Sequence, residues 1–156
     1  MYVMIAGQPL VVHKEVNYMY PKEMVMPNKE ELTSQGFEEL LTKKDVEDKL
    51  GSDDTYLLAV NTVCGCAASS MRPAVIKAKE HAKCPTKLYT VFAGVDTEAV
   101  DTFRSAVESQ GFEPSSPAIF IMKGSKALYA MLRQDINGRD PFDVADDLTA
   151  KFEMLS

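Results

Sequence analysis

The 156 residues can bury one hydrophobic core without disulfide or metal staples, so we expect a single domain and no dependence on a structural metal. The formal charge is −6 at pH 7, and Lys and Arg are dispersed along the chain, which argues against nucleic-acid binding. Three cysteines are too few, and odd in number, for a secreted disulfide framework, so a reducing compartment such as the cytoplasm is favoured.

The first 22 residues show no sustained periodicity. We therefore expect residues 1–22 to form an extension ahead of a domain at residues 23–156. The apolar run at the start, Met1 to Ala6, is too short for a membrane span and lacks a basic leader. This predicts a cytoplasmic protein with no membrane association.

Two helices are predicted before the first strong strand. Pro27 suits the first turn of a helix that passes through Leu32, and Gly36 should end it. Thr42 is a good N-cap for a second helix, which should run to Gly51. The many charges on this second helix are expected to face solvent.

The rest of the chain alternates strands and helices in the order β-α-β-α-β-β-α. A helix between successive early strands favours parallel crossovers, whereas the last two strands are joined by a turn that permits only an antiparallel hairpin. We therefore expect a small mixed β-sheet with helices on both faces. The predicted strands are 55–61, 88–93, 118–122 and 127–132, and the predicted helices are 66–83, 97–110 and 141–152.

Two cysteines lie where the strand 55–61 gives way to a helix, in the order Cys64-Gly65-Cys66. The first N–H groups of a helix lack partners and the helix dipole is positive there, which stabilises a thiolate. Gly65 lets the backbone turn tightly, so that the sulfurs come close enough to react with each other. Cys64, at the exposed strand end, is the predicted nucleophile with a lowered pKa, and Cys66 is predicted to be more occluded. The alternative is two small buried apolar residues.

Further along the predicted helix, Pro73 should kink the axis. Arg72 lies about two turns in, and we expect an ordinary surface ion pair there. Cys84 with His81 could be a second pair of metal ligands. A helix over 66–83 would hold that pair roughly 25 Å from the first, at about 1.5 Å per residue, too far to share a metal. Cys84 is therefore predicted to be an inert thiol, with no metal site.

Several separated motifs resemble those of the bacilliredoxin family, small bacterial proteins with a CGC active site. The resemblance extends over roughly residues 20–155. It is carried by the segment from Asn61 to Ala68 followed by Arg72-Pro73-Ala74, and by Val91-Phe92-Ala93-Gly94, Pro114-Ser115-Ser116-Pro117, Ile136-Asn137-Gly138-Arg139-Asp140, Glu31-Leu32-Thr33 and Gly36-Phe37-Glu38-Glu39-Leu40.

The resemblance implies an α/β thioredoxin-like fold: a central mixed β-sheet flanked by helices, with an N-terminal helical extension. It implies an oxidoreductase that removes bacillithiol from mixed disulfides with client proteins, using bacillithiol as a thiol co-substrate and no bound cofactor. The family's nucleophile falls on Cys64 and its second thiol on Cys66. The fold's cis proline falls on Pro117, so that Ser116 would present its backbone to an extended client segment beside Gly65.

Two alternatives remain open at this point. One is a general disulfide isomerase or oxidase without bacillithiol, favoured if the small ring of a CxC disulfide is strained and so easily reduced. The other is a soft-metal module in which the CxC pair binds Cu(I) or Zn and a partner or dimer completes the coordination shell. A redox site needs a thiolate near neutral pH before any metal binds. The oligomeric state and the clients do not follow from the sequence.

Overall fold

The computed structural model of the protein describes residues 2–5, 8–11 and 20–155. Near the start, β1 (Tyr2–Ile5) and β2 (Gln8–Val11) pair antiparallel in a two-stranded sheet separate from the main one. Much of the extension predicted for residues 1–22 lies outside the described residues, and its boundary stays a prediction. No helix in the described ranges is long and apolar enough to cross a membrane.

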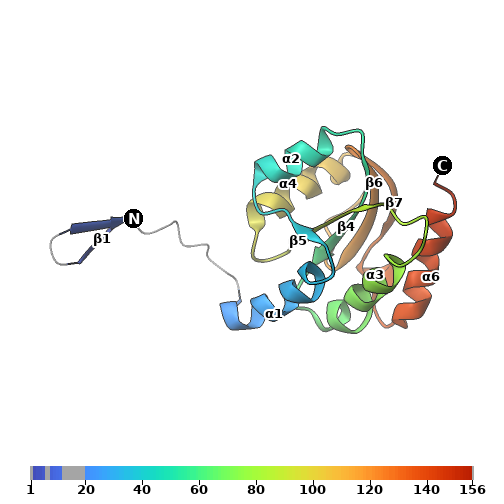
Figure 1. Ribbon diagram of the computed structural model, residues 1–156, viewed down its shortest axis with the longest axis horizontal. Helices are drawn as coiled ribbons and strands as arrows, with labels where there is room; N and C mark the ends of the chain where they lie inside the picture. The colour runs from blue at the N-terminus through green and yellow to red at the C-terminus, as the bar shows by residue number, and fades with distance from the viewer. Residues whose placement is uncertain (1, 6–7, 12–19, 156) are drawn as a thin grey trace.

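The main sheet has five strands in the order β3-β5-β4-β6-β7 (Figure 1). As predicted, β4 and β5 pair in parallel and β6 and β7 form an antiparallel hairpin, so the sheet is mixed. The expectation of a parallel pairing after every intervening helix is wrong for β6. This strand skips β5 and adds to the other side of β4 in the antiparallel direction. The strands are β3 (Glu38–Glu39), β4 (Thr55–Asn61), β5 (Lys87–Phe92), β6 (Ala118–Lys123) and β7 (Lys126–Met131).

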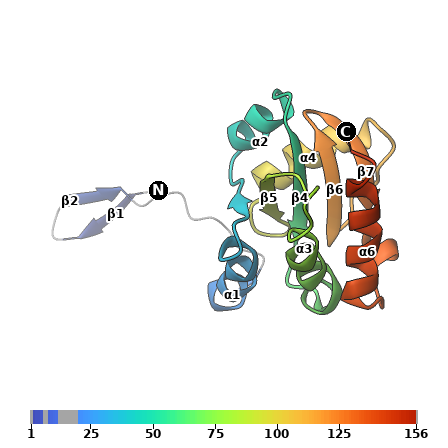
Figure 2. The same ribbon diagram turned by 45° about the vertical axis from the view of Figure 1, so that its right-hand side comes forward.

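Helices cover both faces of this sheet (Figure 2). Alternate residues of β4 supply the two cores, because successive side chains of a strand point to opposite faces. Leu57 and Ala59 pack in the core beneath α3 and α6, and Leu58 and Val60 pack in the core beneath α2 and α4. The helices are α1 (Lys22–Thr33), α2 (Lys43–Leu50), α3 (Arg72–Ala78), α4 (Thr97–Glu108), α5 (Arg133–Ile136) and α6 (Pro141–Phe152).

The helix predicted from Thr42 to Gly51 and the helix predicted over 141–152 are confirmed as α2 and α6. Thr42 caps α2 by accepting a hydrogen bond from the Asp45 N–H. Helix α1 begins at Lys22, so the prediction of a helix start at Pro27 is wrong. Burial of Val25 against the core holds the earlier turns in place, and Pro27 lies inside the helix.

The helix after the cysteines is not the single α-helix that was predicted. Its first part, η1 (Ala67–Met71), is π-helical, and α3 then ends at Ala78 rather than near Lys83. Pro73 consequently lies in the first turn of α3, where a residue without an N–H is tolerated. In the main domain β3 and α5 escaped prediction, because two and four residues are too few to show a period, and the four-residue strands β1 and β2 were not predicted either.

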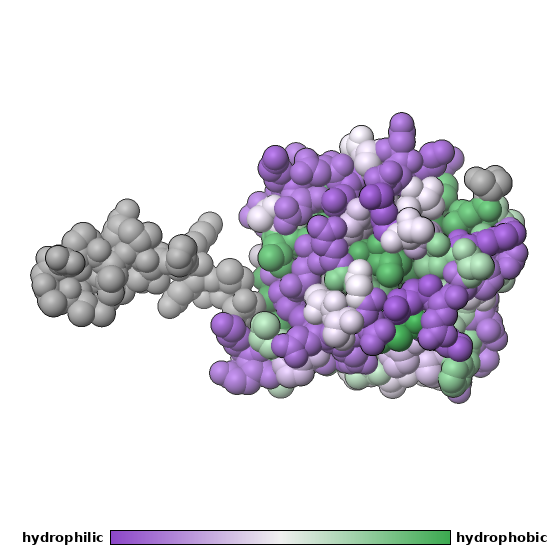
Figure 3. All heavy atoms as spheres, viewed as in Figure 1, coloured by the Kyte–Doolittle hydropathy of each residue, from purple (hydrophilic) through white to green (hydrophobic). Residues whose placement is uncertain are grey.

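Most of the face turned toward the viewer in Figure 3 is covered by hydrophilic side chains, with apolar side chains visible between them. The largest exposed apolar side chains of the described residues include Met24, Phe142 and Met154, which lie on or next to the helices α1 and α6. The cysteine pair lies in the segment that follows β4.

Candidate active site

Two loops lie at the same end of the sheet, because β4 ends where its antiparallel neighbour β6 begins. Val60 lies opposite Ala118 in the register of these strands. The loop with Cys64 follows β4, and the loop with Pro117 precedes β6. The Ser116–Pro117 peptide bond is cis, as the resemblance implied. The sheet therefore brings the CxC motif and the proline loop to one end of the domain.

The two sulfur atoms lie in direct contact. Cys64 Sγ and Cys66 Sγ are 2.9 Å apart, close enough for one thiol to donate a hydrogen bond to the other. Cys64 is half-buried, whereas Cys66 is only 8 % exposed. The predicted order of accessibility is confirmed, so an incoming disulfide meets Cys64 first.

The environment shifts the pKa values of the two cysteines in opposite directions. The hydrogen bond from the Cys66 thiol lowers the pKa of Cys64 most, followed by the backbone N–H of Cys66, the charge of Arg133 and the backbone N–H of Ala67. Burial raises the pKa of Cys66, and the adjacent Cys64 raises it further. The helix N-terminus contributes as predicted, but the neighbouring thiol contributes more.

Gly65 separates the cysteines for a different reason than the one expected. The chain is already helical at Gly65 and Cys66, and Gly65 is not among the glycines with a positive φ. A Cβ atom added there would meet no atom within 4 Å. The turn therefore does not need glycine, and apart from the two neighbouring cysteines the space around Gly65 is open.

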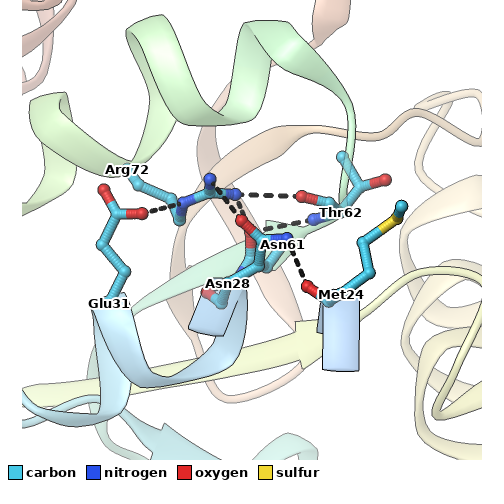
Figure 4. Close-up of polar contacts among 6 residues, drawn as sticks. All are labelled: Met24, Asn28, Glu31, Asn61, Thr62 and Arg72. Carbon is cyan, nitrogen blue, oxygen red and sulfur yellow. Dashed lines mark hydrogen bonds and ion pairs between the residues drawn. The ribbon is translucent and has the colours of Figure 1, made fainter. Parts of the chain in front are cut away.

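Arg72 departs furthest from its prediction. An ordinary surface pair was expected, but the residue is only 1 % exposed and holds four partners (Figure 4). Its Nη1 donates to the Thr62 carbonyl oxygen and to Asn61 Oδ1, both at 3.0 Å. Its Nε donates to Glu31 at 2.7 Å, and its Nη2 donates to Asn28 Oδ1 at 2.8 Å. Arg72 therefore ties the loop before the cysteines to α1.

Asn61 completes this buried network. Its Nδ2 donates to the Asn28 carbonyl oxygen at 2.9 Å, and its Oδ1 also accepts from the Thr62 N–H at 2.8 Å. Every polar atom of the buried Asn61 side chain is thus used, which fixes the backbone two residues before Cys64. The predicted motif contains Asn61, but no local pattern points to its partner on α1, which is distant in the chain.

The cationic side chain that acts on both sulfurs is Arg133, which the sequence analysis missed. Its charge lowers the pKa of Cys64 and of Cys66. Its backbone N–H donates to Ser115 Oγ at 2.7 Å, which joins α5 to the proline loop. A usable signal existed, because Arg133 directly follows the predicted strand that ends at this edge of the sheet.

Cys84 lies away from this site, in the segment after α3. It packs against the core beneath α3 and α6, and burial raises the pKa of its thiol to about 11. His81 Nε2 lies 2.9 Å from a carboxylate oxygen of Glu153. Among the described residues, no group of three or more His, Cys, Asp or Glu is arranged to hold a metal ion.

Comparisons with known proteins agree with this site. The family model described as disulphide isomerase matches residues 20–155. A bacilliredoxin of Cytophaga hutchinsonii is 42 % identical over 137 residues, covering 88 % of this chain and all of its own. Bacilliredoxins of Shouchella clausii and Bacillus licheniformis are 39 % and 38 % identical, covering 85 % and 86 % of this chain and 91 % and 93 % of their own.

A solved structure, the thioredoxin Mala s 13 of Malassezia sympodialis, superposes with a TM-score of 0.51. It covers 76 % of this chain and 90 % of its own, at 16 % identity, and so shows a shared fold. The predicted α/β fold is confirmed. With its contacting Cys64 and Cys66 and its relatives over most of its length, this chain belongs to the bacilliredoxin family and is a thiol-disulfide oxidoreductase with a thioredoxin-like fold.

Proposed function

We propose that this protein removes bacillithiol from mixed disulfides with client proteins, with bacillithiol as its thiol co-substrate. The observation that carries the proposal is the arrangement of the two sulfurs. Cys64 is the accessible member with a lowered pKa, and it lies 2.9 Å from the buried Cys66, whose pKa is raised. The family of the chain supports the choice of bacillithiol.

In the first step, the Cys64 thiolate attacks the bacillithiol sulfur of the mixed disulfide. The bond between bacillithiol and the client cysteine breaks, and the client leaves as a thiolate that takes up a proton. A disulfide between Cys64 and bacillithiol forms. The hydrogen bond from Cys66 keeps Cys64 ionised until this attack.

In the second step, Cys66 attacks Cys64 and expels bacillithiol as a thiolate, which leaves a Cys64–Cys66 disulfide. Once Cys64 is part of a disulfide it carries no negative charge, so the contribution of that charge to the raised pKa of Cys66 disappears. Cys66 is then easier to ionise at the moment when it is needed. Two molecules of a low-molecular-weight thiol return the enzyme to its reduced form.

The client segment is proposed to contact Gly65, Ser116 and Pro117. Open space at Gly65 leaves room for a chain beside the sulfurs, and the half-buried Ser116 belongs to the loop at the same edge of the sheet. A backbone segment there can pair with a client strand. We propose a reducing compartment, the cytoplasm, because the reaction starts from free thiols.

The test uses a model protein whose single cysteine carries bacillithiol. The intact masses of this protein and of the enzyme are followed after mixing. We expect the client to lose the mass of bacillithiol in the presence of the wild-type enzyme, and Cys64→Ser to be inactive. Equal activity of wild type and Cys64→Ser would refute the assignment of the nucleophile.

A second candidate function is general disulfide isomerisation, which the description of the matched family model favours. The same site chemistry applies, with a client disulfide in place of bacillithiol. Refolding of a protein with scrambled disulfides, measured without bacillithiol, separates the two. Refolding at a rate above that of removal from the bacillithiolated client would favour isomerisation as the main activity.

A further inference from the structure

A polar cavity of about 330 Å³ opens beside the proline loop. It is lined by Arg104 of α4, by Glu113, Ser115 and Ser116 of the segment before β6, and by Arg133 and Gln134 of α5. Small-molecule sites have volumes of about 300 to 1,000 Å³, so this cavity is large enough to hold part of a small ligand but not a folded protein.

Its two arginines differ from the other arginines of the chain. Arg72 is paired with Glu31, and Arg139 is paired with Asp147, each at 2.7 Å. Within the described residues, Arg104 and Arg133 form no ion pair with a carboxylate. Two unpaired guanidinium groups around one cavity attract an anion, and a guanidinium matches a carboxylate geometrically.

Arg104 also has an unused donor. Its Nε is buried and has no hydrogen-bond partner, and its Nη2 makes one long contact of 3.5 Å with the Ser115 carbonyl oxygen. A buried N–H without an acceptor is costly, and the buried Arg72 has acceptors for its Nε and both of its terminal nitrogens. A ligand oxygen would supply the missing acceptor.

The cavity lies at the same end of the sheet as the reacting sulfurs, because its loop precedes β6 and the cysteine loop follows the neighbouring strand β4. Arg133 lines it and also acts electrostatically on Cys64 and Cys66. Ser115 joins its two sides, since it accepts from the Arg133 N–H at 2.7 Å and contacts Arg104. Glu113 is exposed, and its negative charge offsets one of the two arginine charges, so the charged residues that line the cavity carry a net charge of +1.

We propose that the cavity between Arg104 and Arg133 binds a carboxylate group of the low-molecular-weight thiol, so that the sulfur of that thiol is delivered to Cys64. This inference rests on the proposed function, because it assigns a binding place to the thiol co-substrate. Arg104 is a binding residue here, whereas Arg133 both binds and lowers the pKa of Cys64.

The test compares two small mixed disulfides of pyridine-thiol that differ in charge. One carries mercaptopropionate, with a carboxylate, and the other carries mercaptoethanol, which is neutral. Cys64 attacks the alkyl sulfur, the disulfide bond breaks, and pyridine-thione is released and measured by its absorbance. The measured quantity is the ratio of the two rate constants at one pH, which cancels differences in Cys64 ionisation between variants. The same ratio for a free model thiol serves as the reference for the intrinsic reactivity of the two reagents.

We expect the wild-type enzyme to prefer the carboxylate reagent, and Arg104→Gln to reduce that ratio roughly three- to tenfold, since charge-assisted hydrogen bonds are weakened by partial solvent exposure. Arg104→Gln should slow the carboxylate reagent more than the neutral reagent, whose rate reports any general effect on the loop. Arg139→Gln is the matched control, because it removes the same charge from a pair outside the cavity. Higher ionic strength should reduce the wild-type preference.

Equal ratios for wild type, Arg104→Gln and Arg139→Gln would overturn the carboxylate site, even if bacillithiol is removed from clients at full rate. A preference that depends on Arg104, in an enzyme that does not act on bacillithiolated clients, would support the site and refute the proposed function. A preference seen only with cysteine peptides flanked by Asp or Glu would overturn the small-thiol assignment and indicate acidic clients.

Discussion

The guanidinium of Arg72 donates to the carbonyl oxygen of Thr62 at 3.0 Å, so the helix that follows the cysteines holds the loop that precedes them. The same side chain reaches Glu31 and Asn28 on α1. Three separate segments are therefore joined through one buried charge, two residues before Cys64. The position of the nucleophile therefore depends on a residue whose hydrogen bonds go to other groups than the two sulfurs.

Arg72→Ala should destabilise the protein strongly. It removes the Arg72 donor from the Thr62 carbonyl oxygen and one of the two donors to Asn61 Oδ1, and breaking a buried pair costs about 3 to 5 kcal/mol. Because Glu31 is 39 % exposed, a loss of about 3 kcal/mol is expected. Arg72→Lys keeps the charge but lacks the planar fork, so it should recover only part of the stability. Urea unfolding measures both.

Arg139 is the control for this comparison. Arg139 pairs with Asp147 at the surface, and exposed pairs contribute about 0 to 1 kcal/mol. Arg139→Ala should therefore cost far less than Arg72→Ala. If the two variants unfold at the same urea concentration, the buried network does not carry the stability assigned to it.

Sequence patterns located the core strands because a short, continuous apolar run is typical of a strand that is buried on both faces. The strand 55–61 was predicted with the observed bounds, since its run of apolar residues is buried on both faces. The helix at 66–83 failed because a π-helical segment changes the phase within one element, and local propensity does not distinguish π-helix from α-helix.

The site was only partly predictable for a related reason. The hairpin between β6 and β7 carries a register shift at Ile121 and Met122. If strand partners are assigned from the turn without this shift, the residue of β7 placed opposite the start of β6 is wrong by one position. With the shift, Arg133 comes to that end of the sheet. The burial of Arg72 depends on α1, which is distant in sequence, and no local pattern reveals it.

Cys84 should react slowly with alkylating reagents in the native protein and rapidly in urea. Burial raises the pKa of its thiol to about 11, against about 8.5 for a free thiol. The folded state therefore holds this proton more tightly, so the free energy of unfolding should fall as the pH rises above about 8.5. Cys84→Ala should reduce that slope in urea titrations at pH 8 to 10. An unchanged slope would contradict the assignment.

Cys66→Ser should stop the reaction after its first step. Cys64 can still take bacillithiol from a client, but no second thiol is present at 2.9 Å to release it. Mass spectrometry of the variant should show one bacillithiol on Cys64, and a small thiol added afterwards should remove it. Release as fast as in wild type without added thiol would mean that Cys66 does not resolve the adduct.

The ionisation of Cys64 should depend on Cys66 in a definite direction. The Cys66 thiol donates the hydrogen bond that contributes most to lowering the pKa of Cys64, so Cys66→Ala removes it and should raise that pKa. The rate of alkylation measured against pH should then rise at higher pH in Cys66→Ala than in wild type. The N–H of residue 66 and the charge of Arg133 remain in this variant and still favour the thiolate. Cys66→Ser keeps a donor at this position and should fall between the two. Identical profiles for all three proteins would show that the helix N-terminus and Arg133 alone set the pKa of Cys64.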